Sequence, residues 1–392
     1  MLRFEKAIKI NNIMYRIGLK ILMGDRAKYA MLIGAIAFAT LLMVQQAGIF
    51  TGIMDWTASI INTTQASIWV IDSKVEDVNQ PFALRDTDLG RVRSVSGVAW
   101  AVPLYQTVQQ VRLKDGTFQS VLLMGIDAST FIGAPTTILK GRLEDLRQSN
   151  AILLDEYGQQ TMLSDNAPPL DVGDTFELND HEARIVGLFR TKRSFSGYPF
   201  VYTTYERAIE MAPKTRRNLS YVLVEPQTGQ SPVAVARKIE EETGLRAYTS
   251  NEFYWSTVWW YWNNTGIPSA FGATILIGFI VGVAVAGQTF YMSVLDNIRY
   301  YGALKAMGAT NGLLARILIA QAALVGFIGY GLGLGAATIF GYFAIRNFSP
   351  PFYMPYQILL VVFLAITSIC VFSALLGIWR IRSLETAEVF RG

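Results

Sequence analysis

The chain has 392 residues, of which 52% are hydrophobic and only 16% are charged. Both fractions differ from those of an average soluble protein and are typical of membrane proteins. The formal net charge of +4 is small, and the excess of basic residues lies beside apolar segments. This placement indicates anionic membrane lipid as the partner of these charges, and we expect no nucleic acid to bind. Cys370 is the only cysteine, which excludes an intrachain disulfide.

Residues 1–28 form a basic segment in front of the first apolar run. They contain seven Lys and Arg residues against two acidic ones, and isoleucines recur between the basic positions. A basic segment with an apolar face is typical of a helix that lies on a membrane surface. We therefore predict a cytoplasmic amphipathic helix over 1–28.

Four uncharged apolar runs are long enough to cross a bilayer, which takes about 20 helical residues. They predict transmembrane helices at 29–54, 267–292, 317–345 and 356–379. The centres of these runs contain no Asp, Glu, Lys or Arg, the residues that usually mark proton and ion pathways. This composition argues against a secondary transporter.

The orientation of the runs follows from the basic residues in their short flanks. Residues 1–28 contain seven Lys or Arg, the segment 296–316 contains three and the tail 380–392 contains three, whereas 346–355 contains one. We therefore expect both termini and the 296–316 loop to be cytoplasmic. The large segment 55–265 is then external.

Residues 55–265 are numerous enough to bury a core of ordinary size. Strand-like runs separated by turn residues predict a mixed α/β domain. The predicted strands are 67–71, 98–102, 106–113, 118–126, 151–154, 175–178, 183–189 and 221–224, and the predicted helices are 86–95, 203–212 and 231–243. The segment shows no metal-ligand spacing and no nucleophile triad, so we expect a binding or mechanical module and not an enzyme.

An aromatic segment precedes the second apolar run. Trp255, Trp259 and Trp262 recur at helical spacing and share one face of a helix. Such a face is typical of an aromatic belt at the membrane interface. The aromatic belt is the favoured interpretation, and a gate or contact surface for an amphiphilic substrate remains the alternative, because the shared face is compatible with either.

The 296–316 loop carries more apolar helical surface than a simple connector needs. It predicts a helix that lies at the cytoplasmic membrane face and docks into a partner protein. The candidate contact residues are Arg299, Tyr300, Tyr301, Gly302, Leu304, Lys305, Ala306, Met307 and Gly308.

Glycines recur within the second and third apolar runs. Small residues at such spacings let transmembrane helices approach closely. The predicted helix-packing residues are Gly278, Gly282, Gly326, Gly329, Gly331, Gly333 and Gly335.

These motifs resemble those of the FtsX/MacB-type ABC permeases, and most closely the DevC-type permease subunit. The similarity lies in Tyr-Gly-Ala-Leu-Lys-Ala-Met-Gly at 301–308, Gly-Phe-Ile-Val-Gly at 278–282 and the tail at 382–390. Further motifs at 141–155 and 172–187 resemble the MacB-like periplasmic core. The resemblance implies an α-helical membrane protein with four transmembrane helices and a large α/β periplasmic domain between helices 1 and 2, in a bacterial inner membrane.

The resemblance also implies the assembly and the mechanism. It implies a homodimer above two copies of a separate ATPase subunit, which binds ATP and Mg, while this chain is non-catalytic and binds no cofactor of its own. Only 28 residues precede the first apolar run, so the ATPase is expected in another chain. The ATPase would move the 296–316 helix, and the transmembrane helices would transmit this motion to a periplasmic membrane-fusion adaptor and a TolC-like outer-membrane duct. The cargo would be an amphiphile such as a glycolipid, peptide or drug.

Two positions depart from the family pattern, because Tyr300 and Gln321 stand where the family often has Glu. Two other functions remain open from the sequence. One is lipoprotein extraction of the LolC/LolE kind, which shares the mechanics. The other is an FtsX-like regulator of a cell-wall hydrolase that transports nothing, although the external segment of about 210 residues is larger than such regulators usually have.

Overall fold

The structure, a computed structural model, describes residues 26–64, 66–162, 168–213, 218–347 and 349–382. Most of the amphipathic helix predicted for 1–28, and most of the tail 380–392, lie outside the described residues. The chain divides into two compact units. The helical unit comprises the residues up to Gly52 and from Gly266 on, and the sheet domain comprises Ile53–Thr265.

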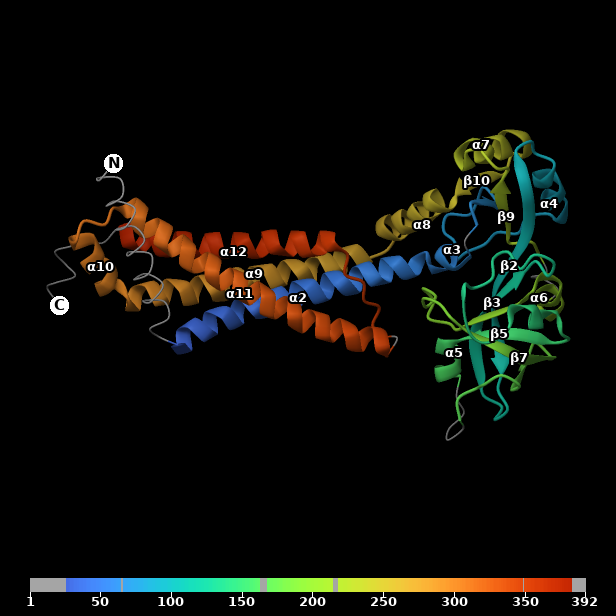
Figure 1. Ribbon diagram of the computed structural model, residues 1–392, viewed down its shortest axis with the longest axis horizontal. Helices are drawn as coiled ribbons and strands as arrows, with labels where there is room; N and C mark the ends of the chain where they lie inside the picture. Colours follow the sequence, from blue (N-terminus) through green and yellow to red (C-terminus); the bar gives the residue numbers. More distant parts are fainter. Residues whose placement is uncertain (1–25, 65, 163–167, 214–217, 348, 383–392) are drawn as a thin grey trace. The chain divides into compact units, whose positions relative to one another are not determined.

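Four long helices make up the helical unit (Figure 1). They are α2 (Arg26–Thr57), α9 (Ile267–Asp296), α11 (Asn311–Arg346) and α12 (Tyr356–Arg382). Each is long and apolar enough to cross a membrane. They extend beyond the predicted runs, most clearly at α11, which begins at Asn311 because the Thr310 side chain accepts a hydrogen bond from the Leu313 N–H and caps it.

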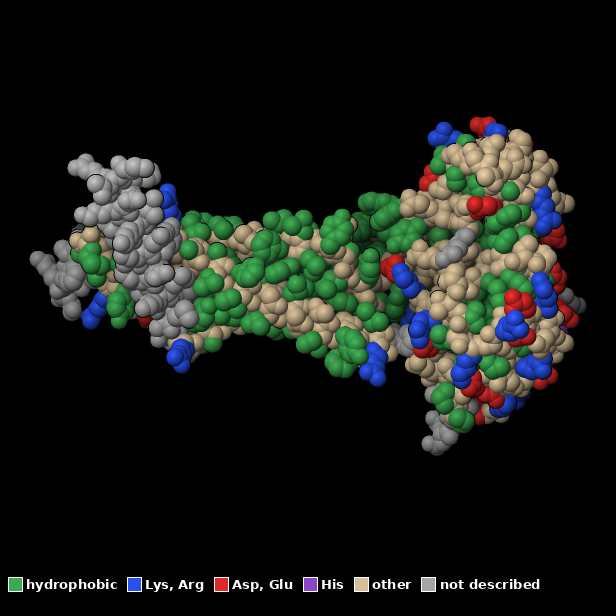
Figure 2. Space-filling view, in the orientation of Figure 1, with side chains coloured by type: hydrophobic (Ala, Val, Ile, Leu, Met, Phe, Trp, Pro, Cys, Tyr) green, Lys and Arg blue, Asp and Glu red, His purple; other side chains and the backbone are tan. Residues whose placement is uncertain are grey.

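The four helices pack around a shared apolar core and remain apolar on their outer surface. The core contains Ile36, Met43, Phe290, Leu318 and Ile369, all nearly inaccessible to solvent. Figure 2 shows hydrophobic side chains over most of the visible surface of this unit, whereas Lys, Arg, Asp and Glu gather on the sheet domain. A helix bundle that is hydrophobic all round needs an apolar solvent, which is what a lipid bilayer supplies.

The sheet domain contains ten strands in one winding sheet. Their order is β10-β1-β9-β2-β3-β8-β5-β7-β4, and β6 pairs with both β2 and β7. The strands are β1 (Ile68–Ile71), β2 (Val98–Arg112), β3 (Phe118–Ile126), β4 (Thr137–Gly141), β5 (Ala151–Asp155), β6 (Thr175–Leu178), β7 (His181–Arg190), β8 (Phe200–Thr204), β9 (Tyr221–Pro226) and β10 (Arg246–Thr249). Only β3/β8 and β5/β7 pair in parallel, so the domain is mixed α/β, as predicted.

The long strand β2 corrects the prediction of two separate strands at 98–102 and 106–113. Residues 98–104 pair with β9, with Pro103 opposite Val222, and residues 105–112 pair with β3. The strand therefore changes partner along its length and needs no break at the proline. The short strands β4, β8 and β10 were not expected from the sequence, because none shows a clear alternation of buried and exposed residues.

Short helices cover the sheet and lead back to the helical unit. They are α3 (Ser59–Thr64), α4 (Asp86–Arg93), η1 (Leu143–Arg147), α5 (Glu156–Thr161), α6 (Tyr205–Met211), α7 (Pro232–Thr243) and α8 (Ser250–Asn264). Helix α7 confirms the prediction for 231–243: Pro232 occupies its first turn and Gly244, with φ of 70°, ends it. Two apolar cores lie against the sheet, one around Tyr105 and Ile152 and one around Val70 and Val222.

Candidate functional site

The predicted docking helix is present as α10 (Ile298–Ala306), between α9 and α11 (Figure 1). Asn297 makes the turn from α9 into α10. Its carbonyl accepts hydrogen bonds from the N–H groups of Tyr300 and Tyr301, and its side-chain amide donates to the Ser293 carbonyl at 2.8 Å. The turn therefore satisfies the backbone groups that the end of a helix leaves unpaired.

Gly308 ends α10 with a positive φ of 94°. The Gly308 N–H bonds to the Lys305 carbonyl and the Ala309 N–H bonds to the Leu304 carbonyl, each at 3.0 Å. This pair of hydrogen bonds, together with the buried side chains of Leu304 and Ala309, is a Schellman motif. Glycine at 308 is required because other residues rarely adopt that backbone conformation.

The inner face of α10 is anchored to the bundle. Tyr301 and Leu304 are 3% and 2% exposed, and Gly302 is also buried. The Tyr301 hydroxyl donates to Gln321 Oε1 of α11 at 3.1 Å, inside the core. Gln321 therefore serves as the partner of Tyr301.

The outer face of α10 is open. Tyr300 is 61% exposed and Met307 is 67% exposed, and Arg299, Ala306 and Gly308 are exposed as well. Lys305 lies partly buried between the two faces. The predicted contact set thus divides into an anchoring face and a face available to a partner, a division that the sequence alone did not show.

An ion pair closes the same end of the bundle. Lys28 Nζ of α2 lies 2.5 Å from Oδ2 of Asp296, which is the last residue of α9. The ion pair therefore links the start of α2 to the end of α9, directly before the Asn297 turn that leads into α10.

The glycines differ in what surrounds them. A Cβ at Gly282 would lie 2.9 Å from Ala39 Cβ, one at Gly329 would lie 2.6 Å from Ile36, and one at Gly333 would lie 2.3 Å from the Ala37 carbonyl oxygen. Gly278 is looser, with Met43 Cγ at 3.6 Å. For Gly331 and Gly335 no described atom lies within 4 Å, so these two do not pack within the bundle as the structure describes it.

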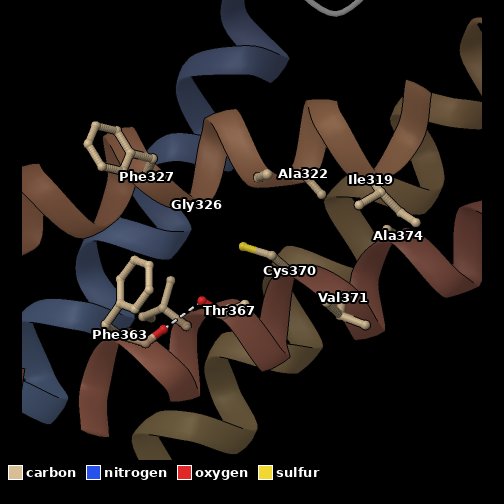
Figure 3. Close-up of a pocket in the computed structure, with 11 residues that line it drawn as sticks. Ile319, Ala322, Gly326, Phe327, Phe363, Thr367, Cys370, Val371 and Ala374 are labelled. Atoms are coloured by element: carbon tan, nitrogen blue, oxygen red, sulfur yellow. Dashed lines mark hydrogen bonds between the residues drawn. The ribbon is translucent and has the colours of Figure 1, made fainter. Parts of the chain in front are cut away.

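Gly326 borders an apolar cavity of about 410 Å³ between α11 and α12 (Figure 3). Figure 3 shows the Cys370 sulfur of α12 directed toward α11, and a Cβ at Gly326 would lie 2.5 Å from it. Thr367 does not offer its hydroxyl to the cavity, because that hydroxyl donates to the Phe363 carbonyl one turn earlier. Gly326 therefore allows the two helices to approach.

The tryptophan segment forms α8. Trp255, Trp259 and Trp262 are 51%, 56% and 45% exposed on one face, and Phe253 and Tyr261 are buried on the other. A capping box of Thr249 and Glu252 starts the helix. Only two residues separate α8 from α9.

A loop after β7, residues 191–197, contacts both helices that connect the sheet domain to the helical unit along the chain. Lys192 Nζ lies 2.7 Å from Asp55 Oδ2 in the last turns of α2. Phe195 packs against Tyr261 of α8, with 4.4 Å between ring centroids.

Arg193 occupies the centre of this loop. Its guanidinium lies 5.1 Å from the centroid of the Trp56 ring and 3.8 Å from that of Tyr157. Such cation–π contacts contribute about 0.5–1 kcal/mol each at exposed sites. We call residues 191–197 the junction loop. Sequence reasoning missed it, because its partners lie far away in the chain and no local pattern marks them.

Residues 30–242 match the family model of the MacB-like periplasmic core domain, and residues 272–386 match that of the FtsX-like permease C-terminal region. The first match alone covers more than half of the chain. No curated protein sequence matches this chain.

Two solved structures illustrate the similarity. The periplasmic region of MacB from Actinobacillus actinomycetemcomitans is 17% identical, with a TM-score of 0.37, covering 53% of this chain and 96% of that one. The extracellular domain of the noncanonic ABC-type transporter YknZ from Gram-positive bacteria is 15% identical, with a TM-score of 0.34, covering 47% of this chain and 98% of that one.

Proposed function

This chain belongs to the FtsX-like ABC permeases with a MacB-like periplasmic core domain, and on that premise we propose that it is the transmembrane subunit of an exporter of the DevC type. It is a multi-pass membrane protein whose family implies an ATPase partner. The proposal concerns how this chain receives the motion of that partner, what it delivers the motion to, and on which side of the membrane each part lies.

The observation that carries the proposal is the two-sided construction of α10. Its inner face is fixed by the buried Tyr301–Gln321 hydrogen bond, and its outer face presents Tyr300 and Met307. A helix that is held firmly on one side and open on the other can receive a push and pass it to α9 and α11. Arg299, Tyr300, Ala306 and Met307 would contact the ATPase.

The junction loop supports transmission to the sheet domain. Along the chain, α2 leads into this domain and α8 leads out of it. Because residues 191–197 contact both helices, displacement of either one would act on the end of β7. The mechanism needs no channel through the bundle.

The proposed assembly is a homodimer with two separate ATPase subunits, which bind ATP and Mg on the cytoplasmic side. A periplasmic membrane-fusion adaptor and a TolC-like outer-membrane protein would continue the path of an amphiphilic cargo. Trp255, Trp259 and Trp262 would lie at the outer membrane–water interface, where they meet lipid or cargo. Both termini and α10 would be cytoplasmic in a bacterial inner membrane.

Mass spectrometry of the proteins that co-purify with the tagged chain tests this proposal. Native membranes are solubilised in mild detergent, and an Arg299→Glu/Met307→Glu variant is purified in parallel as a matched control. We expect an ATPase with Walker motifs and an adaptor with the wild type, and loss of the ATPase from the variant. Both substituted side chains are exposed, and neither residue belongs to the buried set of Tyr301, Gly302 and Leu304.

Other outcomes would redirect the assignment. An ATPase accompanied by a peptidoglycan hydrolase, without an adaptor, would replace the exporter by an FtsX-like regulator. An ATPase accompanied by lipoproteins would favour extraction of the LolC/LolE kind. Absence of any ATPase, under conditions that preserve other ABC complexes, would refute the role of α10.

A further inference from the structure

The loop between β1 and α4 contacts both helices that connect the sheet domain to the helical unit along the chain. It comprises residues 72–80, and we call it the acidic loop. The side-chain amide of Asn79 donates to the carbonyl of Thr57, the last residue of α2, at 2.8 Å. The Val78 N–H donates to Thr257 Oγ1 of α8 at 3.2 Å. The acidic loop therefore joins the end of α2 to α8.

The same loop is fixed to the sheet. The Val78 carbonyl accepts hydrogen bonds from Gln106 Nε2 of β2 at 2.9 Å and from the Tyr221 hydroxyl of β9 at 3.0 Å. On the helix side, Trp260 Nε1 of α8 donates to Glu76 Oε2 at 2.6 Å. A short loop that bonds to two helices and two strands connects these elements, so α8 and the end of α2 are held to the sheet through it.

Asp77 is a buried carboxylate at the centre of this loop. The residue is only 1% exposed. Its Oδ1 accepts a hydrogen bond from the Asn79 N–H at 2.8 Å and another from the Tyr261 hydroxyl of α8 at 3.4 Å. No Lys, Arg or His of the described chain forms an ion pair with it. A buried carboxylate without a counter-charge is costly to ionise, so the closed loop favours its protonated form.

The groups around Asp77 supply no positive charge. The titratable groups that face it are an acid on the same loop and phenols on α8 and β9, namely Glu76, Tyr261 and Tyr221. Lys74, the basic residue of the acidic loop, is exposed. On the junction loop, Lys192 pairs with Asp55, and Arg193 lies over two aromatic rings.

Closure of the loop is therefore linked to a proton. Burial raises the pKa of Asp77 above its ordinary value, and the charge of Glu76 raises it further, against hydrogen bonds from Asn79 and Tyr261. When the loop leaves α8 and the carboxyl meets water, its pKa returns to about 3.9. The closed loop thus binds the proton more tightly than the open one. Closure weakens as pH rises from the ordinary pKa to the raised one, and then levels off.

We propose that the acidic loop is a pH-sensitive clamp, which holds α8 and the end of α2 to the sheet at acidic pH and loosens as Asp77 ionises. As a regulator of the motion that these helices transmit, the clamp rests on the proposed function. Its opening and closing require neither the ATPase nor transport, so the two can fail separately.

Amide hydrogen exchange of the full chain in phosphatidylcholine nanodiscs, without ATPase, tests the clamp from about pH 4 to about pH 8. The amides of Val78 and Asn79 report on it, because both donate hydrogen bonds within it. Each rate is divided by the chemical exchange rate of an unstructured peptide at the same pH. We expect protection to be highest at acidic pH and to fall by up to about tenfold per pH unit between the two pKa values. Protection that did not depend on pH would overturn the proposal.

Asp77→Asn removes the charge and keeps an oxygen that can accept from Asn79 and Tyr261. Protection should then stay at the acidic level of the wild type and no longer depend on pH. Asp72→Asn changes a half-buried carboxylate of the same loop and is the matched control, which should follow the wild type. A fall with pH that persisted in Asp77→Asn would come from another group and would refute the role of Asp77.

Glu76→Gln gives a result that a purely structural role of Asp77 would not. The amide oxygen can still accept from Trp260 Nε1, but the negative charge that helps to raise the pKa of Asp77 is gone. At low ionic strength, where charges are weakly screened, we expect the pH dependence to persist with its midpoint at lower pH. Loss of the pH dependence in this variant would assign the titration to Glu76 and overturn the proposal.

Thr257→Val tests the clamp apart from the proton. The substitution keeps the shape of the buried side chain but removes the oxygen that accepts from the Val78 N–H. We expect the protection of Asn79 to fall about fivefold at every pH, as the loss of one hydrogen bond would produce. Unchanged protection would show that the acidic loop is not clamped to α8.

Discussion

At the scale of single residues, two adjacent tyrosines of α10 have opposite environments. Tyr301 is 3% exposed and bonds to Gln321, whereas Tyr300 is 61% exposed. A helical turn places neighbours about 100° apart, so one side chain enters the core and the next leaves it. Of the two positions that depart from the family pattern, Tyr300 is therefore exposed on α10, and Gln321 is the buried hydrogen-bond partner of Tyr301.

Tyr301→Phe should loosen α10 without emptying the core. The ring stays buried, but the hydrogen bond to Gln321 Oε1 is lost, which costs about 1 kcal/mol. Local opening of 298–306 should then become about fivefold more frequent, measured by amide hydrogen exchange. Tyr300→Phe is the matched control and should exchange like the wild type. Equal protection in both variants would show that the hydroxyl does not anchor α10.

Asp155 links stability to pH in the sheet domain. Its carboxylate ends β5 and accepts the Gly158 N–H at 2.7 Å. Burial raises the pKa of Asp155 to about 7, against the opposing effects of backbone hydrogen bonds from Phe200 and Gly158 and of nearby Arg193. The folded chain therefore keeps a proton that the unfolded chain, with an aspartate pKa of about 3.9, releases.

Stability of the domain should consequently fall as pH rises from about 4 to about 7, and then level off. Asp155→Asn should flatten this part of the curve, measured by thermal unfolding of the purified chain at several pH values. Asp171 provides the opposite control, because the hydrogen bond from Lys140 lowers its pKa, and its contribution is lost at acidic pH. If Asp155→Asn showed the same dependence of stability on pH as the wild type, the raised pKa of Asp155 would be contradicted.

At the scale of elements, the faces of α11 differ in what they contact. Gly329 and Gly333 meet α2 at distances too short for a Cβ, whereas Gly331 and Gly335 face open space in the described structure. All four residues are glycines in the sequence, and only the packing in the folded structure distinguishes the face of α11 that contacts α2 from the face that does not.

Gly333→Ala and Gly331→Ala form a matched pair. The first places a Cβ 2.3 Å from the Ala37 carbonyl oxygen, so the helices must separate and the midpoint of thermal unfolding should drop. The second meets no described atom and should be neutral, or stabilising by up to about 1 kcal/mol, because alanine favours helix more than glycine. Unfolding in detergent measures both. A loss of dimer in Gly331→Ala, with the fold retained, would assign that face to subunit contact.

At the scale of the whole molecule, the fold class of four long apolar helices with an α/β domain between the first and second is the predicted one. The orientation in the membrane stays a prediction. It depends on 13 basic residues on one side of the bundle against one on the other, counted in the sequence.

Single cysteines test this orientation, because Cys370 is the only native one. In a Cys370→Ala background, Thr228→Cys probes the loop before α7 and Met307→Cys probes α10, and both positions are exposed. We expect a membrane-impermeant maleimide to label position 228 in spheroplasts and position 307 only after lysis. The reverse pattern would invert the topology.

The amino-acid sequence by itself determined the four apolar helices, the mixed α/β character of 55–265 and such local elements as α7 and β6. These depend on composition, periodicity and capping residues within a few turns of chain, which is information that a single segment contains. The family resemblance also rests on contiguous motifs, and the family models confirm it at the level of FtsX-like permeases with a MacB-like core.

Only the tertiary structure decided which of these residues act together. Pro103 lies inside β2, opposite Val222 of β9, which the sequence around the proline does not show. The contact of Arg193 with Trp56 and the bond between Tyr301 and Gln321 both join segments that are separated along the chain. Their existence depends on burial and on pairing between distant residues, and no local pattern in the sequence records either quantity.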